Sequence, residues 1–294
     1  MSLQPTIALI GFGEVGQTLA EDLLACGVTR LRAFDTAFQD PASLASQRLA
    51  ATPGVVGSEN HPSAAANADL VISAVTAAQD VAAARCVAEG LHPAAFFLDL
   101  NSVSPAMKQQ SAKLIEGMGG RYVEAAVMSP IGPKRIASPM LLGGAHTEAF
   151  LSLARPLGFI DAQTYSETIG KASAAKMCRS VVIKGLEALL TEALLAARHY
   201  DVLDTVVDSL ADLLPLPDWE TRARYMISRS VEHGTRRAEE MRESAATVEA
   251  AGIAPLMTQM TAMRQGEAAA HSTALSHTGL APMLDAILQE MRTP

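Results

Sequence analysis

Short apolar runs alternate with stretches of helical pattern over roughly the first 165 residues. The run Leu70–Val75 is continuous, as expected for a central parallel strand buried on both faces. The predicted strands are residues 6–10, 31–35, 55–57, 70–75, 96–100, 121–127, 139–142 and 161–165, and the predicted helices between them are residues 17–26, 41–51, 78–89 and 105–117. This alternation indicates an α/β fold with a doubly wound sheet.

From about Ile169 onward almost no strand signal remains. Helices are predicted over residues 170–200, 201–213, 218–233, 235–251, 255–269 and 280–292. We therefore expect two domains: a sheet domain over residues 1–167 and an all-helical C-terminal domain over residues 168–294. The cleft that such a pair leaves is the default site for a small-molecule substrate.

The first helix of the second domain, near 30 residues long, is apolar on most sides. One small domain cannot cover it, so we expect it to pack between domains or against another subunit, which favours a homodimer. Its segment Ser180–Ala197 carries Lys184, Glu187 and Glu192, so we interpret it as a buried helix and not as a membrane span.

A glycine-rich turn follows the first predicted strand and opens the first predicted helix. In that context Gly11 permits a tight turn, Gly13 lets the backbone approach a pyrophosphate, and Gly16 lets the helix pack on the strand. The alternative is a glycine-rich turn in an ordinary βα unit. The strand, the helix and a downstream acid together favour a Rossmann-type dinucleotide site, whose turn comprises Gly11, Phe12, Gly13, Glu14, Val15 and Gly16.

Asp35 ends the second predicted strand, where a carboxylate can bind an adenosine ribose. Such a carboxylate would repel a 2′-phosphate, and no arginine stands at Thr36 or at position 37, so NAD is favoured over NADP. The alternative role for Asp35 is a solvated turn residue. Val75 and Thr76, at the end of the central strand, complete the predicted cofactor site.

Composition narrows the range of partners. A formal net charge of −8 argues against nucleic acid or an anionic membrane as the main partner. Cys26, Cys86 and Cys178 are odd in number and far apart, and no targeting segment is visible, so we expect a reduced, cytoplasmic protein. The histidines and cysteines lack the spacing of metal ligands, so the sequence does not support a metal-dependent mechanism.

Lys176 is the candidate for proton transfer. It lies among small and apolar residues early on the long helix, where partial desolvation can lower the pKa of its ammonium group. From residue type alone, the alternative of a lysine whose stem covers apolar surface carries more weight.

Four segments resemble the β-hydroxyacid dehydrogenase superfamily, which includes 3-hydroxyisobutyrate and 6-phosphogluconate dehydrogenases. Residues 11–16 match its opening motif, and residues 99–105 are similar to its Asp-x-Ser-Thr-x-Ser-Pro substrate loop. Residues 124–129 stand in place of Asp-Ala-Pro-Val-Ser-Gly, and residues 170–176 are similar to the segment that ends in the catalytic lysine. The resemblance implies that Lys176 is the general acid/base, and that Asn101 and Ser102 bind the substrate's carboxylate or hydroxyl.

The chain departs from this family pattern at two places. Ser180, preceded by Arg179, stands where the family has an asparagine, and it lacks the two-donor fork of an amide. Met128-Ser129-Pro130 replaces the family's Ser-Gly-Gly turn, and the proline removes a backbone donor. The pattern is typical of a divergent, phosphogluconate-dehydrogenase-like branch. We expect Ser180 to complete the catalytic set and Met128, Ser129 and Arg179 to contact the substrate.

The helical domain offers one more polar cluster around His233 and Gly234. One interpretation is a helix break at the cleft rim, with His233 and Arg237 reaching the substrate. The other is a helix C-terminus followed by a new, solvated helix. Lys184 either extends a polar stripe into the cleft or covers apolar surface, and the second role is favoured.

The leading hypothesis is an NAD(P)-dependent dehydrogenase of a 3-hydroxyacid or related polar hydroxy substrate, or the corresponding reductase. An imine or enamine reductase on the same scaffold is the second hypothesis, and Lys176 argues against it because those proteins usually carry Asp or Tyr there. The third is a regulatory protein that binds a dinucleotide without turnover.

Overall fold

The computed structural model describes residues 5–213 and 218–292. The chain forms two compact units, the first ending at Met177 and the second beginning at Cys178. This division lies inside one long helix, on the C-terminal side of the boundary expected from the sequence between residues 167 and 168.

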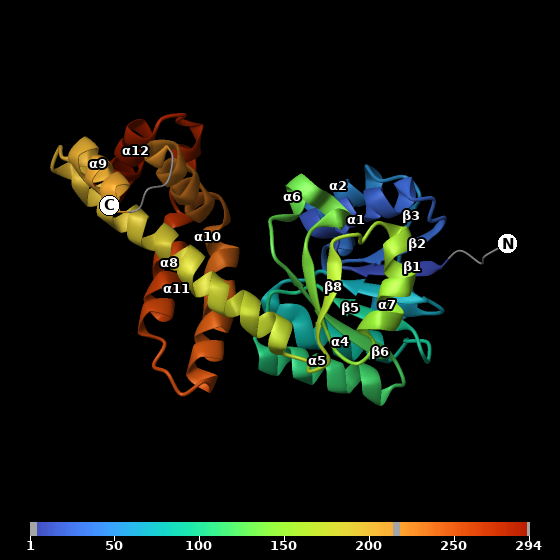
Figure 1. Cartoon of the computed structure of the whole chain (residues 1–294). Helices are drawn as coiled ribbons and strands as arrows, with labels where there is room; N and C mark the ends of the chain where they lie inside the picture. Colours follow the sequence, from blue (N-terminus) through green and yellow to red (C-terminus); the bar gives the residue numbers. More distant parts are fainter. Residues whose placement is uncertain (1–4, 214–217, 293–294) are drawn as a thin grey trace. The chain divides into compact units, whose positions relative to one another are not determined.

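The first unit is built on a sheet whose eight described strands run in the order β3-β2-β1-β4-β5-β6-β7-β8 (Figure 1). The strands are β1 (Thr6–Ile10), β2 (Arg30–Phe34), β3 (Val55–Gly57), β4 (Leu70–Ser73), β5 (Phe96–Asp99), β6 (Arg121–Val127), β7 (Met140–Gly143) and β8 (Ala162–Ser166). All neighbouring strands are parallel except β6 and β7. The order 3-2-1-4-5-6 is that of a Rossmann fold, so the predicted fold class is confirmed.

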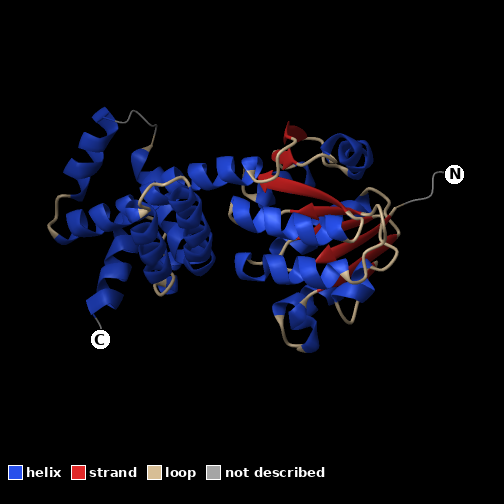
Figure 2. Cartoon of the chain, turned by 90° about the horizontal axis from the view of Figure 1, so that it is seen from below, coloured by secondary structure: helices blue, strands red, loops and turns tan. Residues whose placement is uncertain are grey.

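Helices cover both faces of this sheet (Figure 2). They are α1 (Glu14–Ala25), α2 (Leu44–Ala50), α3 (His61–Ala65), α4 (Asp80–Ala88), α5 (Pro105–Gly117), α6 (Ile131–Lys134) and α7 (Thr147–Ala154). The sequence pattern did not predict α3, α6 or α7, which are short, nor the antiparallel direction of β7.

Alternate strand residues belong to two separate cores. Ile7 and Leu9 of β1 belong to the core that includes α1 and α7, whereas Ala8 and Ile10 belong to the core that includes α4 and α5. Side chains alternate between the two faces of a strand, so a strand covered on both faces must be apolar throughout. This is why the central strands appear in the sequence as continuous apolar runs.

The second unit is all-helical, as predicted. Its described helices are α8 (Lys171–His199), which begins in the first unit, α9 (Leu203–Leu213), α10 (Trp219–Ala250), α11 (Leu256–Ala268) and α12 (Leu280–Arg292). Leu194, Ile227, Met283 and Leu284 form the centre of its core. Among the described helices, none is both long enough and apolar enough to cross a membrane.

The predicted break at Gly234 is wrong, because α10 continues through it. A Cβ atom on residue 234 would lie 2.2 Å from the carbonyl oxygen of Gln265 in α11. Glycine is therefore needed for the close approach of two helices and does not mark a helix end.

Candidate active site

The glycine turn has the geometry expected of a dinucleotide site. Gly11 adopts a φ of +91°, and a Cβ there would lie 2.3 Å from the carbonyl oxygen of Ala74, just after β4. A Cβ on Gly16 would lie 2.2 Å from the Gly11 carbonyl oxygen, so this glycine lets α1 pack on the turn. Gly13 is the N-cap residue of α1, and the space beside its Cα, where a Cβ would lie, is open apart from the adjacent backbone. Backbone N–H groups at the start of α1 can therefore meet phosphate oxygens.

The other residues of the turn do not place a polar side chain inside it. The Phe12 side chain is fully buried against Phe38, so only its backbone is available. Glu14 is exposed in the first turn of α1, and Val15 packs partly on the sheet core.

Asp35 lies beside the glycine turn. Its Oδ2 accepts the Phe12 N–H at 2.8 Å, and its Oδ1 accepts the Ala37 N–H at 2.9 Å. Each carboxylate oxygen has a second acceptor position, and the residue is partly exposed, so both can still accept a ribose hydroxyl. The neighbouring Thr36 is exposed.

The ends of β4 and β5 are joined by the Asn101 side chain. Its Oδ1 accepts the Val75 N–H at 2.7 Å, and its Nδ2 donates to Ser73 Oγ at 3.0 Å and to Asp80 Oδ1 at 2.7 Å. Asn101 is 4% exposed, so its amide is committed to the protein itself. Thr76, just beyond, is exposed and caps a short 3-10 helix (Ala77–Gln79).

A cluster of buried polar side chains lies next to the hydrogen bonds of Asn101. Lys108 Nζ lies 2.7 Å from Asp99 Oδ1, and the Tyr122 hydroxyl donates to Asp99 Oδ2 at 2.6 Å. Burial, with a further contribution from the Asp99 carboxylate, raises the pKa of Asp80 to about 7, although Lys108 acts in the opposite direction. Burial and Asp99 also raise the pKa of Tyr122.

The remaining substrate-loop candidates follow β5 and β6. Ser102 is half-buried directly after Asn101, and Met128 and Ser129 are half-buried after β6. The Ser129 hydroxyl oxygen has no hydrogen-bond partner among the described residues. Because β5 and β6 are parallel neighbours in the sheet that contains β1, these loops lie at the same edge as the glycine turn.

A buried carboxylate anchors the helix that carries Lys176. Glu124 of β6 is 0% exposed, and its two oxygens accept the N–H groups of Gly170, at 2.7 Å, and Ser173, at 2.5 Å. It thereby caps the N-terminus of α8, where a negative charge is favoured. Lys176 follows one turn later and is half-buried.

Further along α8, Arg179 is exposed and Ser180 is buried. Ser180 comes four residues after Lys176, so helical spacing places the two side chains on one face of α8. Arg179 and Ser180 belong to the second compact unit, whereas Lys176 belongs to the first.

The other predicted residues of the helical unit have structural partners. Lys184 forms an ion pair with Glu240 at 2.5 Å, and Arg237 pairs with Glu187. Burial lowers the pKa of Lys184 and opposes the effect of Glu240. His233 lies in the middle of α10, with its Nε2 3.2 Å from Glu232.

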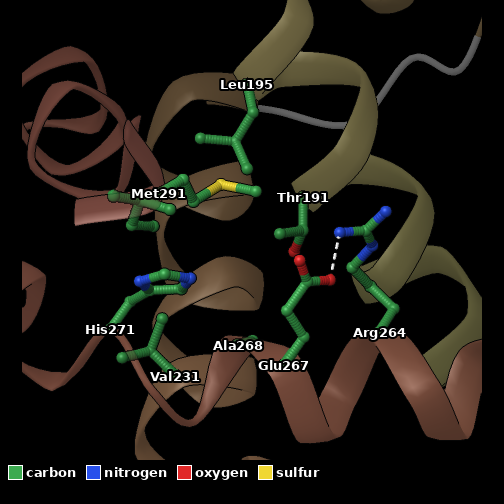
Figure 3. A pocket seen from close by; sticks show the side chains of 9 residues that line it. Thr191, Leu195, Val231, Arg264, Glu267, Ala268, His271 and Met291 are labelled. Atoms are coloured by element: carbon green, nitrogen blue, oxygen red, sulfur yellow. Dashed lines mark hydrogen bonds and ion pairs between the residues drawn. The ribbon is translucent and has the colours of Figure 1, made fainter. Parts of the chain in front are cut away.

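Two cavities within single units do not suit the predicted chemistry. The gap in Figure 3, lined by Thr191, His271 and Met291 among others, encloses only about 10 Å³, roughly the room for one water molecule. A groove of about 780 Å³ next to Arg30, Phe96 and Arg121 lies at the amino ends of the strands. Ligands of open α/β sheets bind at the opposite edge.

Sequence reasoning overlooked Asp80, Lys108 and the role of Glu124. Asp80 and Lys108 are single charged residues on surface-like helical patterns, and only their burial, at 1% exposed each, distinguishes them. The described residues contain no group of three or more His, Cys, Asp and Glu side chains arranged to hold a metal ion.

Two family models match the chain. Residues 6–163, more than half of its length, match the NAD binding domain of 6-phosphogluconate dehydrogenase. The chain belongs to the β-hydroxyacid dehydrogenase superfamily. Residues 197–267 match a domain of unknown function (DUF1932), which places the chain on a divergent branch of that superfamily.

Several individual proteins are similar to this chain over much of its length. A conserved hypothetical protein from Sinorhizobium meliloti, known from a crystal structure, is 36% identical with a TM-score of 0.73, and the match covers 98% of this chain and 97% of that one. An uncharacterized 28.5 kDa protein of Methanothermus fervidus is 26% identical over 87% of this chain and 95% of its own length. Human mitochondrial 3-hydroxyisobutyrate dehydrogenase is 23% identical over 60% of this chain, and the match spans 52% of that enzyme.

A more distant structure shares the fold. A reductive aminase from Aspergillus terreus, in complex with NADPH and ethyl levulinate, is 17% identical over 98% of this chain and 99% of that one, with a TM-score of 0.56. At this identity the likeness concerns the fold alone.

Proposed function

We propose that this superfamily member is an NAD-dependent dehydrogenase of a 3-hydroxyacid or a related polar hydroxy substrate, or catalyses the reverse reduction. The observation that carries the proposal is the anchoring of α8 by Glu124. This anchor ties the helix of Lys176 to β6, which lies next to the loops of Ser102 and Ser129 at the sheet edge of the glycine turn.

The residues of that edge fit a dinucleotide. Gly11, Gly13 and Gly16 would receive the pyrophosphate at the start of α1, and Asp35 would accept the ribose hydroxyls. The Asp35 carboxylate, with no arginine beside it at positions 36 and 37, supports NAD over NADP. When bound, the nicotinamide accepts or supplies the hydride.

Within this proposal the chain itself supplies the proton transfer and the binding of the substrate. Lys176 takes the proton of the substrate hydroxyl in oxidation and returns it in reduction. Ser180, on the same helix face, holds the substrate by one hydrogen bond, and Ser102 and Ser129 bind its acidic or polar groups. We assign no substrate contact to the Asn101 side chain because both of its N–H groups donate within the protein, its oxygen accepts the Val75 N–H, and the residue is 4% exposed.

The assay that tests this proposal is a screen of 3-hydroxyacids, sugar acids and their phosphates with NAD and NADP. For any substrate found, Lys176→Ala is expected to lower kcat by at least about 100-fold while NADH affinity stays unchanged. Lys171→Ala is the matched control, since Lys171 is an exposed lysine on the first turn of the same helix. A Lys176→Ala variant with activity within tenfold of the unmodified protein would overturn the proposed role.

The same screen separates the alternatives. Turnover of ketone and amine mixtures in place of hydroxyacids would favour an imine reductase, a possibility raised by the fold shared with the reductive aminase. Dinucleotide binding without turnover of any compound would favour a regulatory role.

We also propose that the helical unit forms a homodimer. The buried face of α11 consists of two threonines, a glutamine and two alanines, whereas Met260 and Met263 are 56% and 67% exposed. On a helix of a monomer the apolar stripe would face the core. On α11 the largest apolar side chains face away from the core instead. This pattern supports the proposal that a second copy of the chain covers them.

A further inference from the structure

Three of the four hydrogen-bonding positions of the Asn101 amide are occupied by neighbours. The oxygen accepts the Val75 N–H, and the two N–H bonds go to Ser73 and Asp80. These partners come from the end of β4 and the start of α4, while Asn101 itself follows β5. The side chain therefore fixes the segment between β4 and α4 relative to β5.

That segment is in direct contact with the first glycine of the dinucleotide turn. A Cβ on Gly11 would lie 2.3 Å from the Ala74 carbonyl oxygen and 3.2 Å from Val75 Cγ1. Ala74 and Val75 therefore occupy the space that a side chain at residue 11 would fill, and a shift of either residue would change the packing against the turn. The position of Val75 thus helps to define the surface that meets the dinucleotide.

Asp80 in turn fixes the amide of Asn101. Its Oδ1 accepts from Asn101 Nδ2 at 2.7 Å and its Oδ2 accepts from Ser111 Oγ at 2.8 Å, with the residue 1% exposed. The ionisable groups packed around it come from β5, α5 and β6, namely Asp99, Lys108 and Tyr122. The cluster formed by Ser73, Asp80, Asp99, Asn101, Lys108, Ser111 and Tyr122 is hereafter the Asp80 network.

We propose that Asp80 and Asn101 are positioning residues that hold Val75 in the conformation that receives the dinucleotide, and that the affinity for the dinucleotide falls when Asp80 ionises. The proposal rests on dinucleotide binding at this edge and does not require the role of Lys176. It replaces the expected contact between Asn101 and substrate by an action through the backbone of Val75.

The direction of the pH effect follows from charge. The dinucleotide carries a negatively charged pyrophosphate, and its binding shields the sheet edge further from water. Both effects disfavour an ionised carboxylate beneath that edge, so binding and protonation of Asp80 support each other. Because the pKa of Asp80 is about 7, the change in affinity falls near neutral pH.

The test measures the affinity for NADH by fluorescence titration across neutral pH, without any substrate. Asn101→Ala leaves the Val75 N–H without its acceptor and is expected to weaken NADH binding about tenfold at every pH. Asp80→Asn keeps the geometry, since its amide oxygen can accept from Asn101 and its NH2 group can donate to Ser111 Oγ. We expect this variant to bind NADH with an affinity that no longer falls with rising pH.

Two further variants serve as references. Gln110→Ala, on the exposed side of α5, is expected to match the unmodified protein in every titration. Ser111→Ala removes a hydrogen bond that lowers the pKa of Asp80. The affinity of this variant for NADH is therefore expected to fall at a higher pH than that of the unmodified protein. This movement of the pH profile is a result that a merely structural loss would not produce.

The outcomes are distinct. NADH binding by Asn101→Ala within twofold of the unmodified protein overturns the positioning role. If Asn101→Ala does not fold, an Asp80→Asn profile that still falls with pH in parallel with the unmodified protein overturns the proposal by itself. If the unmodified protein binds neither NADH nor NADPH, the dinucleotide role fails together with this inference, whereas failure in the variants alone leaves that role intact.

Discussion

Asp80 has its pKa raised to about 7 because burial and the neighbouring Asp99 carboxylate both disfavour its charge. The positive charge of Lys108, which is 1% exposed and ion-paired with Asp99, lowers the pKa of Asp80 and offsets part of this rise. In the unfolded chain the pKa of the Asp80 carboxyl returns to its ordinary value near 3.8. Between pH 3.8 and about pH 7, Asp80 therefore binds more protons in the folded protein than in the unfolded chain.

The contribution of Asp80 to the free energy of unfolding therefore decreases as the pH rises. Stability from Asp80 is fully present below a pH of about 4 and is lost as the pH rises through about 7, by up to about 4 kcal/mol. Asp80→Asn removes this loss, so the variant is expected to gain stability relative to the unmodified protein as the pH rises. Thermal unfolding followed by circular dichroism at several pH values measures the difference. A constant difference in Tm between the two proteins across this range would contradict the prediction.

At the scale of single residues, the proposed dinucleotide turn can be predicted from a short stretch of sequence, whereas the Asp80 network cannot. Gly11 and Asp35 lie in a local motif whose spacing is set by one βα unit, so a short sequence pattern contains it. The Asp80 network joins Ser73, Asn101 and Tyr122 through the pairing of β4, β5 and β6. No spacing along the chain reveals such a cluster, because its members meet only when the sheet forms.

At the scale of elements, continuous apolar runs gave the strands to within about two residues. The predicted helices of the second unit likewise agree with α8, α9, α11 and α12. The exception is Gly234, where the sequence could not distinguish a helix break from a close helix contact. Either cause favours glycine, and only the position of Gln265 in α11 decides between them.

Gly234→Ala is expected to destabilise the helical unit by about 2–4 kcal/mol, because its Cβ would lie 2.2 Å from the Gln265 carbonyl oxygen and 3.0 Å from Ala269 Cβ. Gly185→Ala in α8 is the matched control. Its Cβ would meet only Thr261 Oγ1, at 3.9 Å, so alanine's helix propensity should stabilise the protein by up to about 1 kcal/mol. Urea unfolding followed by helical circular dichroism compares the two variants. Equal effects in both would show that the contact with α11 is not tight.

At the scale of the whole molecule, the α8 and α11 helices of the helical unit each expose several apolar side chains. Val182 and Leu189 of α8 are 68% and 56% exposed, and they share one face because they are seven residues apart. Met260 and Met263 add the stripe on α11, which contacts α8 through the hydrogen bond from Gln265 to the Lys184 carbonyl group. A monomer would leave both apolar surfaces in water, at an unfavourable free energy that association removes.

The combined substitution Met260→Glu and Met263→Glu is expected to weaken self-association by at least about 100-fold, because two carboxylates would lose their hydration at the interface. Sedimentation velocity over a range of protein concentrations measures the change, and circular dichroism checks that the helices remain folded. Ile160→Glu is the control, since Ile160 is a similarly exposed apolar residue, at 66%, in the sheet unit. The unmodified protein and this control should both sediment as dimers. A monomeric unmodified protein would refute the dimer itself, whereas a double variant that stays dimeric would show that the two copies meet through a different surface.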